Sequence, residues 1–526
     1  MTTRFVLPSA LLLSSLVAAQ AGCSGSSAAS MGATPGGAQD NALAATQIQE
    51  GLVPRPEDFT VAGLLAQYDL PLADNSCDQA LCIQAAYGVA PVLYQNKGAV
   101  FVQMGFSSGI DETTFERSPL NLAVVVDRSG SMAGQKLTAV KLALSQLVNQ
   151  LTAQDRLALV LFDDRVDVIL PSTPVTNPAS IQATIASIAV RGSTDMAAGL
   201  QAGIAQVQAH AGLVSDRVML FTDADANTGS TQKSAFVNLA TTAAEQGIGL
   251  TLFGVGIDLN QDLVLAITQL RGGSYYFLSD PDAIGTIFDS DFAFMVTPLA
   301  YDMVFRLEPS SGFAVGAVYG YSSWQAGSTS VDISVPTVFL SRKHGAIIVR
   351  MDPTAGAWPT GQPPLAELSL SYTPTDGSAQ VQQSFEAAYA GTDPLSDSVA
   401  YYSENAVRKS IDLVNTALSE AEAARLYYTS PSSSQAAVVL LTRTQTMLQI
   451  EGYDLNDTDL TQLADQVQAL ENNIQSGRGS VSATSTGNTT GTYPADCSMS
   501  HAPSRPSPVV LFALALLLWR VRRRAG

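Results

Sequence analysis

Between residues 119 and 297, short apolar runs alternate with longer segments of helical periodicity. Such alternation builds right-handed β-α-β units and a doubly wound, mostly parallel sheet. The short run at 166–170 follows the turn Asp163-Asp164-Arg165, which favours an antiparallel edge strand. Strands are predicted at 120–126, 156–162, 166–170, 217–222, 249–255 and 274–278, with helices at 134–152, 178–189, 195–211, 232–246, 260–271 and 281–292.

A chain of 526 residues has room for roughly three domains at about 150 residues each. Residues 299–390 hold short strand-like runs separated by turns, which predicts a β-sandwich. Residues 49–118 contain strands but are too short and broken to form a core alone, so we expect them to pack on that later β-domain. The α/β domain is then inserted in or beside the β-sandwich. Residues 398–475 carry apolar stripes that predict a helical hairpin packed on the body.

The first residues have the pattern of an export signal. Arg4 precedes an apolar run, and Ala19-Gln20-Ala21 fits the small-x-small cleavage pattern, which predicts a signal peptide over 1–21. The sequence around Cys23 alternatively resembles a bacterial lipoprotein junction, with Cys23 as the lipidated residue. Residues 22–48 are small and polar and predict a flexible tether.

The last residues form a second tail. Residues 476–507 are rich in Ser, Thr, Gly and Pro and predict a linker, and 508–526 combine a short hydrophobic run with an arginine cluster. Together with Cys497 this tail resembles the myxobacterial-type C-terminal sorting signal, which implies processing near Cys497 and retention at the surface. The alternative is a plain single-span membrane anchor. Both place the middle of the chain outside the inner membrane, at the cell envelope, outer membrane or cell surface.

Charge and histidine content narrow the function. The formal net charge of −19 argues against a nucleic-acid partner, which requires a basic surface. The three histidines, at 210, 344 and 501, have no other catalytic group near them in sequence, so a Ser-His-Asp or Cys-His enzyme is poorly supported. We therefore expect no enzyme.

Two of the four cysteines lie close together. Cys77 and Cys82 flank a loop-like stretch, and in an exported protein we expect a local disulfide between them. Two free thiols are the alternative.

Oxygen-bearing side chains gather where predicted strands end. Asp127 ends the strand at 120–126, with Ser129 and Ser131 in the turn after it, and Asp223 follows the strand at 217–222. Thr194 lies in the turn that opens a helix at 195. Ligand sites in open α/β sheets lie beyond the carboxyl ends of strands, and hard oxygen ligands suit Mg²⁺, Mn²⁺ or Ca²⁺. Taken singly, each residue has a structural alternative as a strand end, a turn or a helix cap.

Together these residues resemble the metal-ion-dependent adhesion site (MIDAS) of von Willebrand factor type A (VWA) domains. The resemblance implies the Rossmann-like, doubly wound sheet of that family. The resemblance covers about 118–297, with Ala224 standing where the family has glycine in Thr-Asp-Gly. The flanks are distantly similar to bacterial surface proteins and inter-alpha-trypsin inhibitor heavy chains.

The resemblance implies an adhesive or assembly function on the cell envelope. It implies metal ligation by Asp127, Ser129, Ser131, Thr194 and Asp223, Mg²⁺ as the cofactor with Mn²⁺ or Ca²⁺ as alternatives, and an envelope or extracellular protein that offers an Asp or Glu as the last ligand. A structural scaffold with a purely structural metal, and a metal-assisted hydrolase, are the alternative functions.

Overall fold

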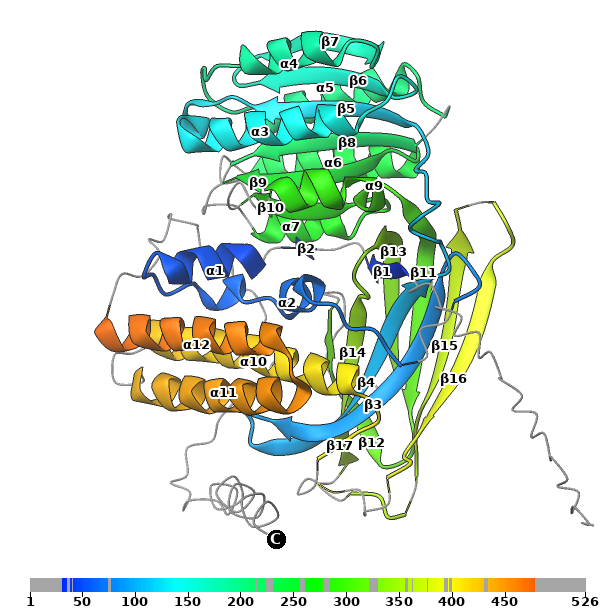
Figure 1. Cartoon of the computed structure of the whole chain (residues 1–526), viewed down its shortest axis with the longest axis vertical. Helices are drawn as coiled ribbons and strands as arrows, with labels where there is room; N and C mark the ends of the chain where they lie inside the picture. Colours follow the sequence, from blue (N-terminus) through cyan, green and yellow to red (C-terminus); the bar gives the residue numbers. More distant parts are fainter. Residues whose placement is uncertain are drawn as a thin grey trace, which may run out of the picture.

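The computed structural model describes residues 31–35, 38–39, 41–73, 77–212, 215–223, 230–255, 261–278, 284–320, 330–354, 358–361, 363–375, 377–391, 396, 400–429 and 434–477. Within these ranges, an α/β domain lies on top of a large curved sheet, and a layer of helices covers one side of that sheet (Figure 1). No helix of the described ranges is both long and apolar enough to cross a bilayer. The predicted signal peptide, Cys23, Cys497, the 476–507 linker beyond Gly477 and the hydrophobic end at 508–526 lie outside the described residues.

The α/β domain is built on a seven-stranded sheet in the order β2-β10-β9-β8-β5-β6-β7. All neighbouring strands are parallel except β7, which pairs antiparallel with β6 at the edge. This confirms the predicted fold class. The strands are β2 (Ala38–Gln39), β5 (Leu120–Asp127), β6 (Arg156–Phe162), β7 (Val166–Pro174), β8 (Ser215–Thr222), β9 (Gly249–Val255) and β10 (Ser274–Leu278).

Helices cover both faces of this sheet because alternate residues of each buried strand point to opposite sides. In β5, Leu122, Val124 and Val126 join one apolar core, and Ala123 and Val125 join the other. The helical elements are η2 (Gly130–Met132), α3 (Gln135–Gln150), α4 (Pro178–Ala186), α5 (Met196–Gln208), α6 (Ser230–Glu245), α7 (Gln261–Thr268), η3 (Thr286–Ser290) and α9 (Phe292–Met295).

The second sheet is ten-stranded and its pairs are all antiparallel. Strand β4 pairs with β3 along one edge and with β14 and then β1 along the other. Strands from both halves of the sheet contribute to one apolar core, so the sheet folds over itself as a sandwich. Its strands are β1 (Met31–Pro35), β3 (Cys82–Val92), β4 (Lys97–Ser108), β11 (Pro298–Pro309), β12 (Phe313–Tyr319), β13 (Val331–Ser341), β14 (Ala346–Pro353), β15 (Pro364–Pro374), β16 (Val381–Ala388) and β17 (Tyr401–Tyr402).

The α/β domain is thus inserted between β4 and β11 of the sandwich, and the segment before it enters both sheets. Strand β1 pairs with β13 and β4, whereas β2 pairs with β10 at the edge of the α/β sheet. Helix α1 (Asn41–Gln49) follows directly. The prediction of a flexible tether over 22–48 is therefore wrong for its described part, because the backbone of 31–35 forms strand hydrogen bonds that composition alone does not reveal.

The helical region packs on the outer face of β3 and β4. It holds three long helices, α10 (Asn405–Thr429), α11 (Ser434–Leu455) and α12 (Thr458–Ser476), rather than the two of a hairpin, and they lie side by side in Figure 1. The side chain of Asn415 ties α10 to the β3–β4 turn through Leu93 N and Pro91 O, each 3.0 Å away. The shorter helices η1 (Pro56–Asp58) and α2 (Val61–Gln67) border the same apolar core.

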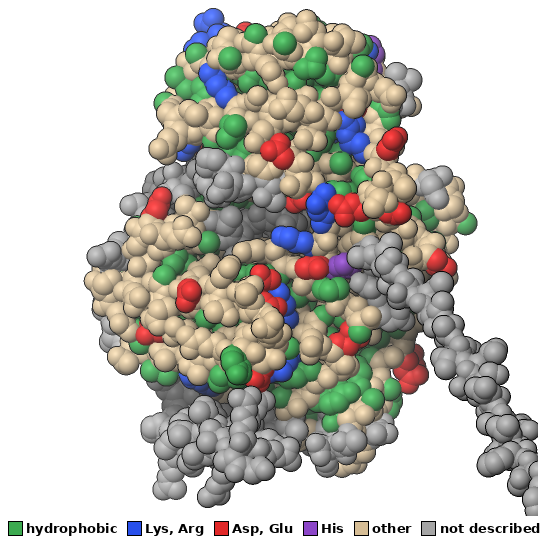
Figure 2. Space-filling view, viewed as in Figure 1, with side chains coloured by type: hydrophobic (Ala, Val, Ile, Leu, Met, Phe, Trp, Pro, Cys, Tyr) green, Lys and Arg blue, Asp and Glu red, His purple; other side chains and the backbone are tan. Residues whose placement is uncertain are grey.

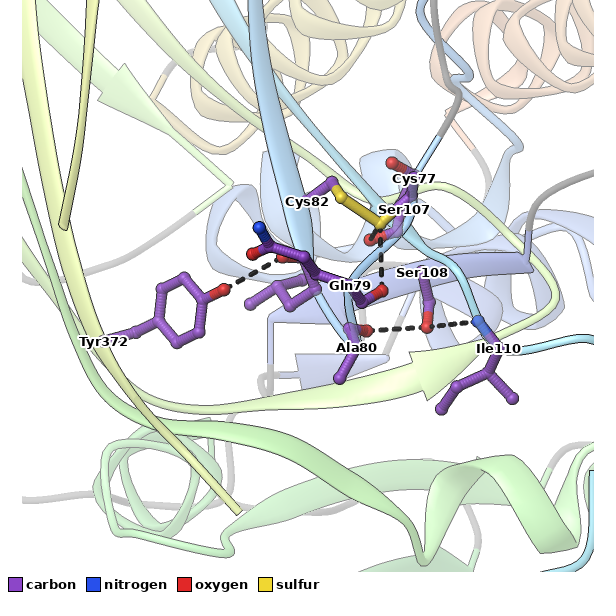
Figure 3. The surroundings of a disulfide bond; sticks show 9 residues. Cys77, Gln79, Ala80, Cys82, Ser107, Ser108, Ile110 and Tyr372 are labelled. Atoms are coloured by element: carbon purple, nitrogen blue, oxygen red, sulfur yellow. Dashed lines mark hydrogen bonds between the residues drawn. A yellow bond between two sulfur atoms is a disulfide. The ribbon is translucent and has the colours of Figure 1, made fainter. Parts of the chain in front are cut away.

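A disulfide joins Cys77 to Cys82 at the start of β3, with a Cα–Cα distance of 5.6 Å (Figure 3). Side chains of β4 and β15 bind the loop that the disulfide closes. Ser108 Oγ donates to Ala80 O at 2.7 Å, and the Tyr372 hydroxyl donates to Leu81 O at 2.9 Å.

Charged side chains of both signs gather along the junction of the two domains (Figure 2). Arg342 pairs with Glu112 at 2.8 Å, and its guanidinium lies over the Phe294 ring. Deeper in the junction, Gly272 N donates to Thr337 Oγ1 at 2.7 Å, and the buried Arg217 lies over Phe339. These contacts hold the starts of β8 and β10 against β13.

Candidate metal centre

Asp127 and Asp223 meet because β5 and β8 are parallel neighbours. The pairing of Val126 with Phe221 places Asp127 beside Thr222, whose hydroxyl donates to Asp127 Oδ2 at 2.7 Å. Ser129 N donates to Asp127 Oδ1 at 2.8 Å. Asp127 is therefore fully buried, with a hydrogen bond to each carboxylate oxygen.

The turn after β5 connects the two carboxylates through the Ser129 amide and two serine hydroxyls. Ser129 Oγ lies 3.0 Å from Ser131 Oγ, and Ser131 Oγ donates to Asp223 Oδ1 at 2.9 Å. The turn is the 3₁₀ element η2, anchored by the fully buried Met132. Four of the five predicted ligands thus form one continuous group of oxygens at the carboxyl ends of the strands.

Thr194 lies in a loop that is held against this turn. Gly130 N donates to Gly192 O at 3.1 Å, and Arg191 N donates to Arg128 O at 2.6 Å. Within the described residues, Thr194 itself has no hydrogen bond to the other four predicted ligands, so it lies beside the group without completing it.

The helix-capping alternative for Ser131 and Thr194 is wrong. Helix α3 has Gly134 at its N-cap, and α5 has Asp195, whose side chain accepts from Ala198 N at 3.1 Å. Ser129 precedes η2 without a side-chain cap hydrogen bond. None of the hydroxyls of Ser129, Ser131 and Thr194 is therefore needed to cap a helix.

A further buried acid, Asp163, lies next to the candidate centre, and the sequence alone assigned it no role. Asp163 directly follows β6, is fully buried and accepts from Arg128 Nε and Arg191 Nε, both at 2.7 Å. Burial raises the pKa of Asp163, but the hydrogen bonds from Arg191, from Arg165 N and from Arg128 outweigh it and hold the pKa well below its usual range. This carboxylate joins the Asp127 turn to the Thr194 loop. Its place directly after a strand was the signal available in the sequence.

Asp127 differs because no described residue supplies it with a counter-charge. Burial raises the pKa of Asp127, and the hydrogen bonds from Ser129 and Thr222 do not offset that effect. In the described part of the chain, neither lysine nor arginine pairs with Asp127, whereas Asp223 pairs with Lys136 at 2.5 Å.

The donor set fits a hard divalent cation. Carboxylate and hydroxyl oxygens are the ligands of Mg²⁺, Mn²⁺ and Ca²⁺, and a buried carboxylate without a counter-ion is stabilised by a cation. The described residues contain no group of three or more His, Cys, Asp and Glu side chains placed to hold a metal. The arrangement therefore depends on hydroxyl groups as much as on acids.

Comparison with known proteins places this domain. The von Willebrand factor type A domain model matches residues 121–290. The chain is 26% identical over 271 residues to the uncharacterized protein YfbK of Escherichia coli (strain K12), covering 50% of this chain and 46% of that protein. It is 29% identical over 177 residues to inter-alpha-trypsin inhibitor heavy chain H3 of Mesocricetus auratus, covering 31% of this chain and 20% of that protein. The matched region thus spans less than half of either relative.

Among solved structures, a von Willebrand factor type A protein from Catenulispora acidiphila aligns over 76% of this chain and 97% of its own, at 13% identity and a TM-score of 0.47. The matched residues cover strands β5 to β10 of the mostly parallel sheet. Residues 121–290 of this chain form a von Willebrand factor type A domain.

Proposed function

We propose that this protein is a binding module of the cell envelope that holds a divalent cation and, through it, an acidic side chain of a protein partner. The observation that carries the proposal is the buried Asp127 carboxylate, which has no cationic partner among the described residues and is linked to Asp223 by hydroxyls. Ser129, Ser131, Asp127 and Asp223 would hold the cation, and the neighbouring Thr194 loop would complete the shell.

A bound Mg²⁺ supplies a Lewis-acidic coordination position that accepts a carboxylate oxygen. The residues of this chain bind and orient it, and two negative charges leave the cation attractive to one more acid. The histidines that the structure describes are engaged elsewhere, His210 with Arg156 and His344 with Asp69. This favours binding over hydrolysis as the function.

An oxidising location supports the envelope assignment. The Cys77–Cys82 disulfide is typical of exported proteins and rare in the cytosol. The predicted export signal and C-terminal tail agree with such a location.

The test is a Mg²⁺ titration of the purified protein by calorimetry, comparing wild type with Asp127→Ala. We expect binding in wild type and its loss in the variant, with both folded by circular dichroism. Asp332→Ala, which removes an exposed acid of the large sheet, is the matched control and should bind as wild type does. Equal Mg²⁺ affinity in wild type and Asp127→Ala would overturn the metal site.

The partner is tested by capture from an envelope extract with Mg²⁺ or with EDTA. We expect protein retained by wild type in Mg²⁺ and released by EDTA, and none retained by Asp127→Ala. Retention that EDTA and Asp127→Ala both leave unchanged contradicts an acidic ligand on the metal and favours a structural scaffold.

A further inference from the structure

Lys136 has an unusual position in the candidate metal centre. It lies in the first turn of α3, and its Nζ is 2.5 Å from Asp223 Oδ2. The lysine side chain is 29% exposed, whereas the Asp223 side chain is buried. In the described part of the chain, Lys136 is the one cationic side chain paired with either carboxylate of the centre.

The two arginines next to the centre are already neutralised. Arg128 and Arg191 both pair with Asp163 and Asp167, so two positive and two negative charges balance within this cluster. Lys136 therefore supplies the local counter-charge for Asp223. With Lys136, the two carboxylates and the ammonium carry one net negative charge. Without Lys136, the two carboxylates would carry two.

Both oxygens of Asp223 are occupied by groups of this chain. Ser131 donates to Oδ1 at 2.9 Å, and Lys136 donates to Oδ2 at 2.5 Å. A hydroxyl can keep its place beside a divalent cation, because its oxygen is itself a ligand. An ammonium has three donors and no acceptor, so it cannot share that place.

We infer that Lys136 is a tethered competitor that must release Asp223 before this carboxylate can serve a divalent cation. The inference rests on the proposed function and adds its regulation. The flexible four-carbon stem of lysine lets the ammonium swing out to solvent. Lys136 thereby stabilises the cation-free centre and weakens cation affinity, so that the centre fills only when the cation concentration is sufficient.

The experiment measures Mn²⁺ affinity by electron paramagnetic resonance in wild type, Lys136→Met, Lys136→Arg and Lys141→Met. Lys141 is on the same helix, but its Nζ donates to Ala186 O, away from the centre. Removing a unit charge next to a divalent cation should tighten Mn²⁺ binding by about tenfold in Lys136→Met. Lys136→Arg and Lys141→Met should stay within about threefold of wild type, because the first keeps the charge and the second leaves the centre intact.

A second readout separates competition from a structural role. Without cations, Lys136→Met should unfold at a lower temperature than wild type, since Asp223 loses its partner, and saturating Mn²⁺ should reverse that order. A variant that is less stable under both conditions, with Mn²⁺ affinity unchanged or weakened, would overturn the inference.

The wild-type titration judges the proposed function separately. Mn²⁺ binding that Asp127→Ala abolishes supports the metal centre, whatever Lys136→Met does. Absence of Mn²⁺ binding in both wild type and Lys136→Met overturns the proposed function and the inference together.

Discussion

Two buried aspartates at opposite ends of the parallel sheet have opposite electrostatic surroundings. Asp155, just before β6, accepts from Arg117 Nη1 at 2.8 Å and Nη2 at 2.6 Å, and from Leu120 N at 2.7 Å. Burial raises the pKa of Asp155, but Arg117 and the backbone amides outweigh it and lower the pKa overall. Asp127 is equally buried and has hydrogen bonds but no cationic partner in the described ranges, and its pKa is raised.

The two ends of the sheet also differ in what they contact. The starts of β8 and β10 lie against the sandwich, where Arg217 packs under Phe339 of β13, and the connection from β4 enters the α/β domain at the start of β5 (Figure 1). The carboxyl ends carry Asp127 and Asp223. Asp155 is thus paired with Arg117 of the connection from β4, whereas Asp127 has no cationic partner among the described residues and lies at the strand ends, where ligand sites of open α/β sheets are found. Burial alone therefore does not distinguish a structural carboxylate from a candidate ligand, whereas the source of the counter-charge does separate these two.

Neutralising each acid in the presence of EDTA should affect stability very differently. Asp155→Asn should lower the free energy of unfolding of the α/β domain by about 3–5 kcal/mol, because it leaves Arg117 with a side chain only 10% exposed and no carboxylate. Asp127→Asn should change it by about 1 kcal/mol or less, or stabilise the domain, because it removes a buried charge without a partner. Urea unfolding followed by circular dichroism measures both, and equal losses would contradict the distinction.

A third buried acid, also without a cationic partner among its described contacts, should make stability depend on pH. Glu420 of α10 lies in the helical core, where burial raises its pKa to about 8 and the hydrogen bond from Gln466 only partly opposes the rise. The folded protein therefore holds a proton that the unfolded chain, with a carboxyl pKa of 4.5, releases. Stability should be greatest below the unfolded value and fall as pH rises toward the folded value. The free energy of unfolding should fall by about 2–3 kcal/mol between about pH 5 and about pH 7, at roughly 1.4 kcal/mol per pH unit.

Glu420→Gln should flatten that dependence and make the protein more stable above about pH 7, because the amide carries no charge to bury. Glu422→Gln is the matched control on the same helix, since Glu422 is paired with Arg425 near the surface. Thermal unfolding across pH measures the slope. A wild-type slope that survives Glu420→Gln would assign the pH dependence to other groups.

Sequence patterns predicted the parts of this fold that depend on local periodicity. The expected strands at 156–162, 249–255 and 274–278 match β6, β9 and β10, because buried parallel strands are continuous apolar runs. Asp127 and Asp223 could be placed together because parallel strands end at one edge. Strand β1 could not be predicted, since Met31–Pro35 has no alternating pattern and its pairing depends on β4 and β13.

The ion pairs around the candidate metal centre could not be predicted from the sequence either. Lys136 and Asp223 are 87 positions apart, and Arg128 and Asp163 are 35 apart, so their contacts depend on how loops leave the strands. No periodicity encodes that geometry. The position of Thr194 is of the same kind, because backbone contacts between Gly130 and Gly192 hold its loop.

The smallest expected effect concerns that loop. Gly192 has a φ of +64°, and a Cβ there would lie 2.2 Å from Asp164 Oδ1 and 3.2 Å from Asp163 Cβ. Gly212 has a φ of +78° with no heavy atom within 4 Å of such a Cβ. Alanine at either position should cost about 1–2 kcal/mol for the left-handed backbone, but only Gly192→Ala should also push the Thr194 loop away from the centre.

We expect Gly192→Ala to weaken Mg²⁺ binding by about threefold to tenfold, at 1.4 kcal/mol per factor of ten, and Gly212→Ala to leave it unchanged, both by calorimetry. Undiminished affinity in Gly192→Ala would mean that the four oxygens joined by hydrogen bonds bind the cation without Thr194. The cation that neutralises Asp127 would then need only four residues, which are Asp127, Ser129, Ser131 and Asp223. Weakened Mg²⁺ affinity would mean that Thr194 contributes to cation binding. The ion pairs of Asp163 would then position Thr194 for the cation that neutralises Asp127.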